Sequence, residues 1–326
     1  MPAERTALTR ALDVLRARTF MFALVLAVAL FVANLIVQSS FVSSGGLPET
    51  LADLAPFAIV AMASAPSILI GGLDLSVGPV LSLTNVVMVA VLLPHGLGNP
   101  ATSIPILLAL GAFVGALSGA LISYLRLPAI IVGLGALFIV TGVGQQILLT
   151  PEQAGSNWTD HLGGKFGPVP GGLVTIVVPL LVWLALKRTP FVKAMFSIGG
   201  DAPTAFASGM NVGAIRIVAY ALGGMFAAIA GLALTGLIRS ADSSLGLQYT
   251  LIAIAAVSLG GTPVGGGRGG LVGALIGAAC IYLIQNLLSG LNISALYLDV
   301  VYGCVLIAAV ILSSQLAPRR LGGPAR

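Results

Sequence analysis

The chain has 326 residues, of which 58% are hydrophobic and only 8% are charged. A soluble globular domain covers its surface with charged side chains, so this composition excludes that class and indicates an integral membrane protein. The net charge of +5 does not indicate nucleic-acid binding, because the basic residues are scattered singly between apolar runs. Both cysteines lie inside apolar runs and both histidines stand alone in polar segments, so we expect neither a disulfide nor a metal site.

Apolar runs long enough to cross a bilayer recur along almost the whole chain. A helix of roughly 18 or more apolar residues spans about 30 Å of hydrocarbon. The first run follows four arginines, but it is longer than the apolar part of a signal peptide and no clear cleavage site follows, so we interpret it as a membrane anchor. We predict ten transmembrane helices, at residues 20–37, 51–70, 75–93, 104–124, 127–149, 173–186, 212–236, 245–260, 269–288 and 295–312.

The positions of Lys and Arg test this count, because short loops rich in them stay on the cytoplasmic side. With ten helices and a cytoplasmic N-terminus, every Lys and Arg except Lys165 and Arg239 lies on that side. Omitting one helix would move Arg319, Arg320 and Arg326 to the outside. We therefore expect a single all-α transmembrane domain over residues 1–326 with both termini cytoplasmic. Its predicted segments outside the membrane are a cytoplasmic N-terminal segment (1–19), an external loop (150–172) and a cytoplasmic loop (187–211).

Two glycine-rich segments interrupt the apolar runs, GGLDLSVG at 71–78 and GGTPVGGG at 260–267. Both follow an apolar run and precede another, on the same predicted side of the membrane, which is a weak indication of internal duplication. In transporters, such interruptions in two halves of a chain indicate unwound helices around a central pathway. We expect Asp74 to accept backbone N–H bonds at a helix start rather than to touch a substrate. The predicted structural break comprises Gly71, Gly72, Asp74, Gly260 and Gly261.

Neutral polar side chains lie within the predicted helices, whereas no Glu, Lys, Arg or His falls in the middle of one. This pattern disfavours a proton-coupled mechanism, although sodium coupling through backbone carbonyls stays open. Hydroxyl and carboxamide groups suit the path of a neutral, polyhydroxylated solute. The alternative is hydrogen bonding between helices that only holds the bundle together. The candidate path residues are Ser82, Asn85, Thr141, Gln145 and Asn286.

The predicted cytoplasmic loop contains GGDAPTAFASG, which indicates a short helix. Asp201 is a suitable N-cap, Pro203 is tolerated in a first turn, and Gly209 is a suitable terminator. A helix this short is not stable alone in water, so it must pack against something else. The residues alone leave open whether a partner protein or lipid headgroups contact its apolar side chains, Ala205, Phe206 and Met210.

The sequence contains no Walker A loop and no GxSxG or HExxH motif, so we expect this chain neither to bind ATP nor to be an enzyme. The energy for transport then comes from elsewhere. The alternative is an ATP-independent secondary transporter or channel for a small polar solute, which would need coupling-ion ligands that the sequence does not reveal. A membrane anchor that only scaffolds other proteins fits poorly with so many spans that carry spaced polar residues.

Four motifs follow one another in an order that is specific when they are taken together. They are GGLDLSVG at 71–78, RLPAIIVGLGALFIVTGV at 126–143, IGGDAPTAFASGMNV at 198–212 and IAIAAVSLGGTPVGGGRGGLVGALIGA at 252–278. With these motifs the chain resembles, from about residue 51 to 312, the ribose-type permease family of bacterial ATP-binding-cassette (ABC) sugar importers. That family is part of the branched-chain amino acid/sugar permease superfamily.

The resemblance implies the membrane-spanning permease subunit of an importer for a monosaccharide or related polyol, in the bacterial plasma (inner) membrane. The partners it implies are ABC ATPase subunits, a second permease copy or a homologous permease, and an external or periplasmic sugar-binding protein. It also implies that this chain binds no cofactor, whereas ATP and Mg bind to the partner ATPase subunit.

The resemblance further implies that the short cytoplasmic helix docks into the ATPase. The coupling residues are then Gly199, Gly200, Asp201, Ala205, Phe206 and Gly209. Members of the family often carry an acidic and a basic residue where this chain has Pro203 and Phe206. We therefore expect the contact with the ATPase to be more apolar here.

Overall fold

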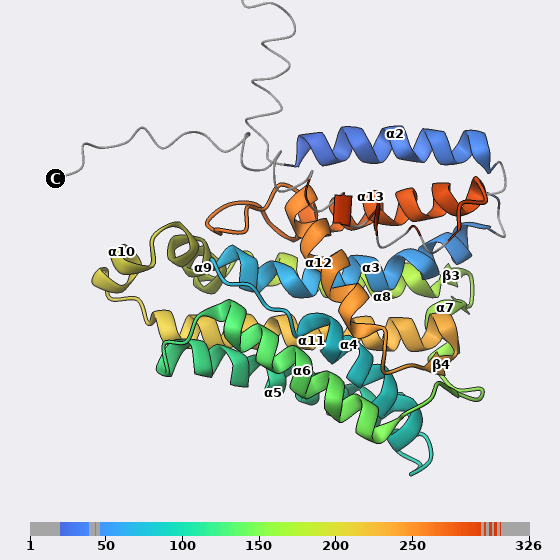
Figure 1. The fold of residues 1–326 in the computed structure, drawn as a ribbon, viewed down its shortest axis with the longest axis horizontal. Coiled ribbons are helices and arrows are strands. Elements are labelled where there is room, and N and C mark those ends of the chain that lie inside the picture. Colours follow the sequence, from blue (N-terminus) through green and yellow to red (C-terminus); the bar gives the residue numbers. More distant parts are fainter. Residues whose placement is uncertain are drawn as a thin grey trace, which may run out of the picture.

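The computed structural model describes residues 20–38, 43, 46–294, 297, 300–301, 303–304 and 307. These residues form mostly α-helices, together with two short pairs of strands (Figure 1). For the described part of the chain, the predicted all-α class is confirmed. The predicted N-terminal segment 1–19 and most of the predicted last span, 295–312, lie outside the described residues.

Each of the first nine predicted apolar runs coincides with a helix. The N-terminal half contains α2 (Met21–Val37), α3 (Gly46–Leu69), α4 (Val77–Val86), the π-helix η2 that continues it (Val87–Leu92), α5 (Pro100–Tyr124) and α6 (Ala129–Ile147). The C-terminal half contains α8 (Gly171–Leu186), α9 (Pro190–Gly200), α10 (Ala202–Ala207), α11 (Val212–Ile238), α12 (Gly246–Leu259) and α13 (Leu271–Gly290). The segment between α6 and α8 contains β1 (Glu152–Gln153), α7 (Asp160–Gly163), β2 (Lys165–Phe166) and β3 (Val169–Pro170).

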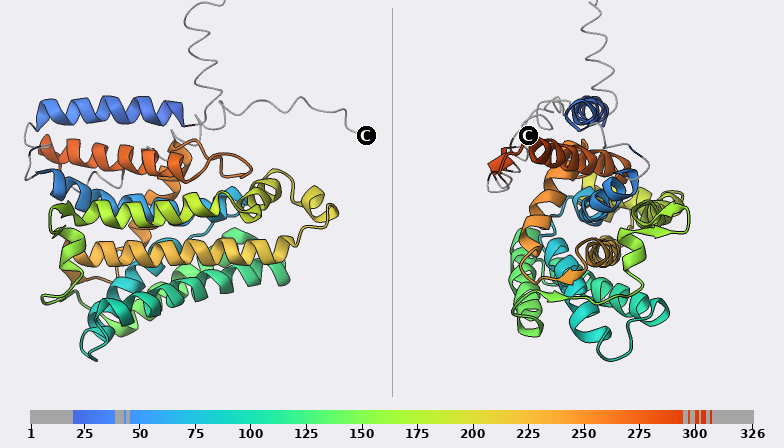
Figure 2. Two further views of the ribbon diagram at one scale, coloured as in Figure 1. Left: turned by 180° about the vertical axis from the view of Figure 1, so that it is seen from behind. Right: turned by 90° about the vertical axis from the view of Figure 1, so that its right-hand side faces the viewer.

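The two strand pairs mark one end of the bundle, and α10 marks the other (Figures 1 and 2). β1 pairs with β4 (Ser240–Ala241), which follows α11, and β2 pairs with β3, both in antiparallel register. We call these the strand end and the α10 end. Lys165 and Arg239, the two basic residues predicted to face outside, both lie at the strand end.

Five described helices are long and apolar enough to cross a membrane: α3, α5, α6, α11 and α13. A sixth candidate is the pair α8 and α9, which is bent by 84° at its break. Three further apolar segments, Met21–Val37, Val77–Leu92 and Gly246–Leu259, are shorter. The chain is thus a multi-pass membrane protein, whereas the count of ten spans and the sides of the termini stay predictions.

Helix α9 is a feature that the sequence analysis did not predict, because its residues fall within the predicted cytoplasmic loop 187–211. Thr189 precedes the helix and Pro190 occupies its first turn, where proline fits without loss of a hydrogen bond. Val192, Met195 and Ile198 recur every three residues and are buried. This apolar stripe explains why the segment folds onto the bundle.

The central helices of the bundle are α3 and α11. α3 contacts α8, α11, α12 and α13, α11 contacts α5, and α2 lies beyond α13 at the edge (Figures 1 and 2). The close approach of α5 to α11 depends on glycine: a Cβ on Gly111 or Gly115 would overlap the backbone of α11, at Gly224 and Tyr220. Small residues four apart are a common way to bring helices together in a membrane.

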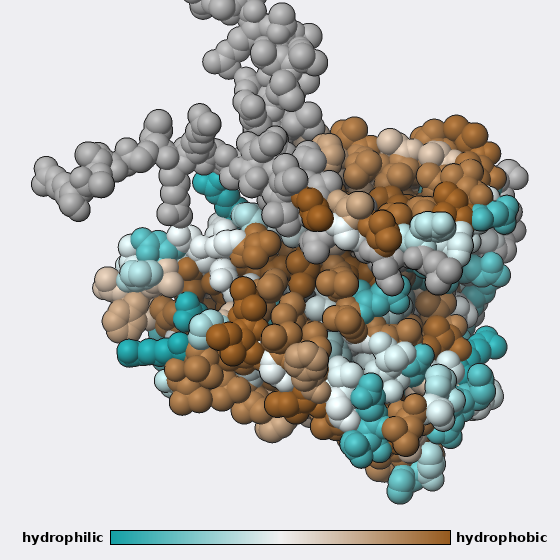
Figure 3. All heavy atoms as spheres, viewed as in Figure 1, coloured by the Kyte–Doolittle hydropathy of each residue, from teal (hydrophilic) through white to brown (hydrophobic). Residues whose placement is uncertain are grey.

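The peripheral helices expose apolar side chains. Of the most apolar stretch of each helix, 28% is buried in α6 and 33% in α5, against 83% in α3. The molecular surface over α5 and α6 is largely hydrophobic (Figure 3). A soluble protein does not leave so large a surface uncovered, whereas lipid tails or a second membrane protein cover it well.

Candidate functional site

The two glycine-rich interruptions, almost 200 residues apart in sequence, meet at the α10 end. The backbone N–H of Gly267 donates a hydrogen bond of 3.0 Å to the carbonyl oxygen of Leu69, the last residue of α3. Gly71 has φ +75°, and a Cβ there would lie 3.2 Å from the carbonyl oxygen of Gly265. The two interruptions, which follow α3 and α12, are therefore held against each other.

The end of α9 lies against this same junction. A Cβ on Gly199 would overlap the carbonyl oxygen of Leu69 and lie 2.5 Å from the nitrogen of Gly267. A Cβ on Gly267 would in turn lie 2.9 Å from the Cα of Gly200. We call this contact between Leu69, Gly199 and Gly267 the glycine junction, because the backbones approach too closely for any side chain.

Helix α10 follows α9 directly and has the bounds that its sequence predicts. Asp201 is the N-cap: its carboxylate accepts a bond of 3.3 Å from the backbone N–H of Thr204 and one of 2.7 Å from that residue's hydroxyl. Gly209 lies just beyond the helix with φ +83°, a conformation that favours glycine. Phe206 is 73% exposed, whereas Ala205 is buried. α10 lies at the tip of the bundle (Figure 1), and it leaves the Phe206 ring exposed.

Asp74 lies between α3 and α4 and is 1% exposed. Its Oδ1 accepts a 2.9 Å bond from the backbone N–H of Ser76 and a 2.6 Å bond from the Ser76 hydroxyl. Ser76 is the N-cap of α4, so the carboxylate holds the turn that starts this helix. This geometry agrees with a structural role for Asp74 at the break.

Ser82 and Asn85, two of the predicted path residues, face the segment that follows α11. The Ser82 hydroxyl donates to the carbonyl oxygen of Asp242 at 2.7 Å. The Asn85 amide donates to Thr235 and Ser240, at 2.9 and 2.8 Å, and accepts a bond from the nitrogen of Asp242. These bonds hold α4, α11 and β4 together. This is the alternative role given for neutral polar residues in the sequence analysis, namely hydrogen bonding that holds the bundle together.

The remaining predicted path residues do not share one surface. Thr141 and Gln145 lie on α6, where Gln145 is exposed on this peripheral helix. Asn286 lies near the end of α13 and lines a cavity at the strand end. The structure therefore does not bring the five residues together into one path.

The cavity beside Asn286 has a volume of about 360 Å³ and lies between α3, α11, α12 and α13. We call it the outer cavity. Its polar lining consists of one carboxylate, three carboxamides, a serine and two tyrosines, and no described lining residue is Lys, Arg or His. These polar residues are Asp53, Gln248, Tyr249, Tyr282, Gln285, Asn286 and Ser289.

Aromatic rings form one wall of the outer cavity. The Phe57 ring contacts Tyr249 edge to face at 5.8 Å between ring centroids, and Tyr282 at 6.1 Å. Asn286 donates weakly to the Tyr282 hydroxyl at 3.4 Å, and its Oδ1 is buried without a partner among the described residues. Aromatic faces beside amides can hold the C–H face and the hydroxyls of a sugar-sized solute.

Sequence reasoning missed every residue of this cavity except Asn286. A signal was present, because the lining residues recur at helical spacing. Asp53 and Phe57 are four residues apart on α3. On α13, Tyr282 and Asn286 are four apart and Asn286 and Ser289 are three apart, so each set lies on one helix face. The aromatic residues of this face are as typical of helix packing as of a solute site, so their spacing alone does not identify a cavity.

A comparison with protein families matches residues 46–310 to a family described as the permease component of a branched-chain amino acid transport system. The match includes both glycine-rich interruptions, α10 and the outer cavity. The chain belongs to this permease family. It is a transport subunit rather than an enzyme, as the absence of hydrolytic motifs in its sequence predicted.

Several curated relatives are similar over almost the whole chain. The ribose import permease protein RbsC of Haemophilus influenzae is 33% identical over 298 residues, which is 87% of this chain and 90% of the relative. RbsC of Bacillus subtilis is 33% identical, with 86% and 88% covered. The galactose/methyl galactoside import permease protein MglC of Escherichia coli is 30% identical, with 84% and 88% covered. No solved structure matches the chain.

Proposed function

We propose that this chain is the permease subunit of an ABC importer and translocates a monosaccharide or related polyol. The observation that carries the proposal is the glycine junction, which connects the helix pair α9–α10 to the ends of α3 and α12. An ATPase that binds α10 and moves it would act directly on the two central interruptions. The junction therefore gives a chain without a nucleotide site a means to use ATP hydrolysis.

The outer cavity supports a sugar rather than an amino acid as the solute, although the family description names branched-chain amino acids. A free amino acid carries a carboxylate, which in this cavity would lie beside the Asp53 carboxylate without a basic side chain to neutralise either charge. The described lining offers aromatic rings, amides and hydroxyls but no basic side chain. The relatives reported above are named for ribose and galactose import, which agrees with this chemistry.

The proposed complex contains two permeases, either two copies of this chain or this chain and a homologue. Two ATPase subunits bind the α10 helices, and a solute-binding protein delivers the sugar at the strand end. ATP and Mg bind to the ATPase subunits, and this chain holds no cofactor. Within the bacterial plasma membrane, the chain forms a single domain of ten spans with both termini and α10 on the cytoplasmic side.

Copurification tests the proposal directly. The chain is extracted gently from its native membrane, and the proteins that accompany it are identified by mass spectrometry. We expect an ATPase subunit with a Walker A loop, and we expect the reconstituted complex to take up sugar only with ATP. A chain that purifies alone and moves sugar in ATP-free liposomes would instead be a secondary transporter or channel.

The solute class needs a separate assay. Uptake of a labelled sugar by the reconstituted complex is measured in competition with ribose, galactose, leucine and valine, with the solute-binding protein present. We expect only the sugars to compete. Competition by leucine or valine alone would contradict the assignment of the outer cavity to a sugar while leaving the ABC assignment intact.

A further inference from the structure

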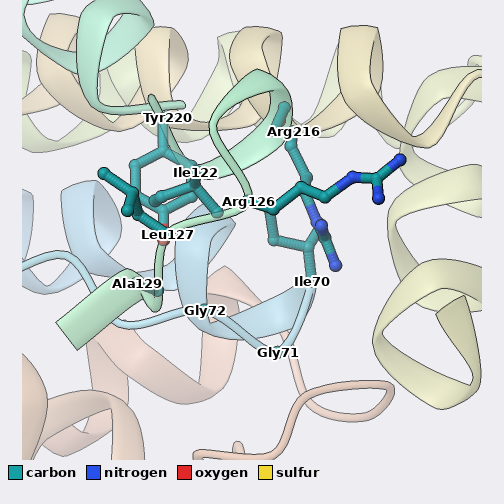
Figure 4. A pocket seen from close by; sticks show the side chains of 10 residues that line it. Ile70, Gly71, Gly72, Ile122, Arg126, Leu127, Ala129, Arg216 and Tyr220 are labelled. Atoms are coloured by element: carbon teal, nitrogen blue, oxygen red, sulfur yellow. The ribbon is translucent and has the colours of Figure 1, made fainter. Parts of the chain in front are cut away.

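A second cavity, of about 440 Å³, opens at the α10 end of the bundle, opposite the outer cavity. The C-terminal end of α5, the turn into α6, the N-terminal part of α11 and the interruption after α3 form its walls. We call it the arginine cavity. Its lining residues include Gly71, Gly72, Ser123, Arg126, Arg216 and Tyr220 (Figure 4).

Two guanidinium groups give this cavity a positive charge. Arg126 lies in the turn between α5 and α6, and Arg216 lies near the start of α11. Figure 4 shows both side chains extending toward the same side of the cavity. Neither forms an ion pair with a described residue; Arg239 pairs with Asp160 at the opposite end of the bundle. No lining residue is acidic, and the nearby carboxylate of Asp74 is engaged with Ser76.

A buried hydroxyl without a partner lies in the same cavity. Tyr220 is 1% exposed, and its hydroxyl has no hydrogen-bond partner among the described residues. A Cβ on Gly72 would overlap this hydroxyl, so the Tyr220 side chain can occupy its position only because residue 72 is glycine. A buried hydroxyl that stays unpaired is unfavourable, which indicates that a polar group from outside the described residues completes it.

Exposed apolar side chains surround Arg126, and they favour one kind of anion over another. Tyr124, Leu125, Ile130 and Ile131 flank Arg126 in sequence and are between 59% and 74% exposed. A soluble anion gains nothing from an apolar rim, whereas the acyl chains of a lipid cover it. Basic pockets between helices at the cytoplasmic side of a membrane are suited to the headgroups of anionic lipids.

We propose that the arginine cavity binds the phosphate headgroup of an anionic lipid. Arg126 and Arg216 donate to the phosphate oxygens, since each guanidinium presents five N–H donors in a planar fork. The Tyr220 hydroxyl bonds to a hydroxyl or oxygen of the same headgroup. Gly71 and Gly72 line the cavity and belong to the interruption after α3, so a bound headgroup would contact the segment that adjoins the glycine junction.

Lipid retention by the full chain tests this site. The purified protein is titrated in detergent with phosphatidylglycerol, phosphatidylcholine or inorganic phosphate, and bound ligand is followed by native mass spectrometry. We expect phosphatidylglycerol to bind more tightly than phosphatidylcholine. Each of Arg126→Gln and Arg216→Gln weakens phosphatidylglycerol binding about fivefold, and the corresponding Lys variants weaken it less. Arg188→Gln, which changes an exposed arginine outside the cavity, leaves binding unchanged.

Tyr220→Phe separates a bound headgroup from a merely structural hydroxyl. Removal of an unpaired buried hydroxyl leaves the lipid-free protein as stable as before or more stable, by thermal unfolding. The increase in Tm on addition of phosphatidylglycerol is then smaller than in the wild type. An equal increase in Tm in both proteins would remove Tyr220 from the site.

The possible results distinguish the sources of the anion. Arginine-dependent binding of phosphatidylglycerol supports the lipid, and arginine-dependent binding of inorganic phosphate without any preference for the lipid assigns the same phosphate chemistry to a soluble anion. Phosphatidylglycerol binding that is unchanged in both Gln variants overturns the proposal. The proposal is also overturned if these variants still bind phosphatidylglycerol but no longer bind the ATPase, because the arginines would then form a contact with a protein. The Arg126 side chain is exposed, so Arg126→Gln is expected to fold. This variant still tests the proposal if Arg216→Gln does not fold.

Discussion

The glycine junction makes a sharp prediction for Gly199→Ala. The new methyl group would overlap the carbonyl oxygen of Leu69 and lie 2.5 Å from the nitrogen of Gly267. Because both neighbours are backbone atoms, they cannot rotate away, and the segments must separate. Overpacking of this kind costs about 1–3 kcal/mol, and loss of the 3.0 Å bond between Gly267 and Leu69 adds about 1 kcal/mol. We expect the junction to be weakened by about 2–4 kcal/mol.

The adjacent glycine provides a matched control. The resemblance places Gly200 among the coupling residues too, but a Cβ there would meet nothing within 4 Å, so Gly200→Ala adds the same methyl group without the overlap. Gly199 and Gly200 are the last two residues of α9, so both substitutions change its helix propensity in the same direction and by a similar, small amount. A difference between the two variants therefore reports the contact of Gly199 with the junction.

The assay compares transport with ATP hydrolysis. The permease is reconstituted with its ATPase and solute-binding protein, and the sugar moved per ATP hydrolysed is measured together with the amount of assembled complex. We expect Gly199→Ala to assemble but to move at least several-fold less sugar per ATP, while Gly200→Ala behaves as the wild type. Unchanged coupling in Gly199→Ala, or equal loss in both variants, would refute the role of the junction.

Three further predictions concern other parts of the molecule. Gly209 has φ +83°, so Gly209→Glu should insert normally but abolish transport-linked ATP hydrolysis. Gly209→Asn should retain much of this activity, because asparagine tolerates the conformation. Normal coupling in the Glu variant would contradict the role of α10. Asp74→Asn should lower the Tm or slow transport without changing the ratio of uptake of two sugars, and a changed ratio at normal expression would place Asp74 in the substrate path. Phe57→Leu removes two ring contacts at the outer cavity and should raise the KM for uptake about threefold to tenfold, while Phe138→Leu, an exposed residue on α6, should leave KM unchanged.

Local features of the fold were predictable from the sequence because they depend on neighbouring residues. The apolar runs gave the helices to within a few residues, since the length of a membrane helix is set by the bilayer. Asp201 and Gly209 marked the bounds of α10, because a cap and a left-handed terminator act within one turn. Helix α9 was missed because its buried stripe is short and its flanks are charged.

Long-range features were not predictable in the same way. Both interruptions were recognised as breaks, but nothing in either segment indicates that Gly267 bonds to Leu69 across almost 200 residues. Likewise, a carboxamide on a helix looks the same whether it faces a solute or another helix. Asn85 bonds within the bundle and Asn286 lines a cavity, and only the neighbouring helices decide between these outcomes.

The position of the junction within the bundle explains why a small surface helix could drive transport. α3 is the most buried of the five long apolar helices, so a displacement of its end at Leu69 is transmitted to the α8, α11, α12 and α13 contacts. Its other half lines the outer cavity through Asp53 and Phe57. α3 therefore has one end at the glycine junction and the other at the proposed sugar site, and Pro56 and Pro66 lie within the helix between these ends. Packed cores move between discrete arrangements rather than deforming continuously, so a push at α10 that repacks Leu69 must also change the shape of the cavity.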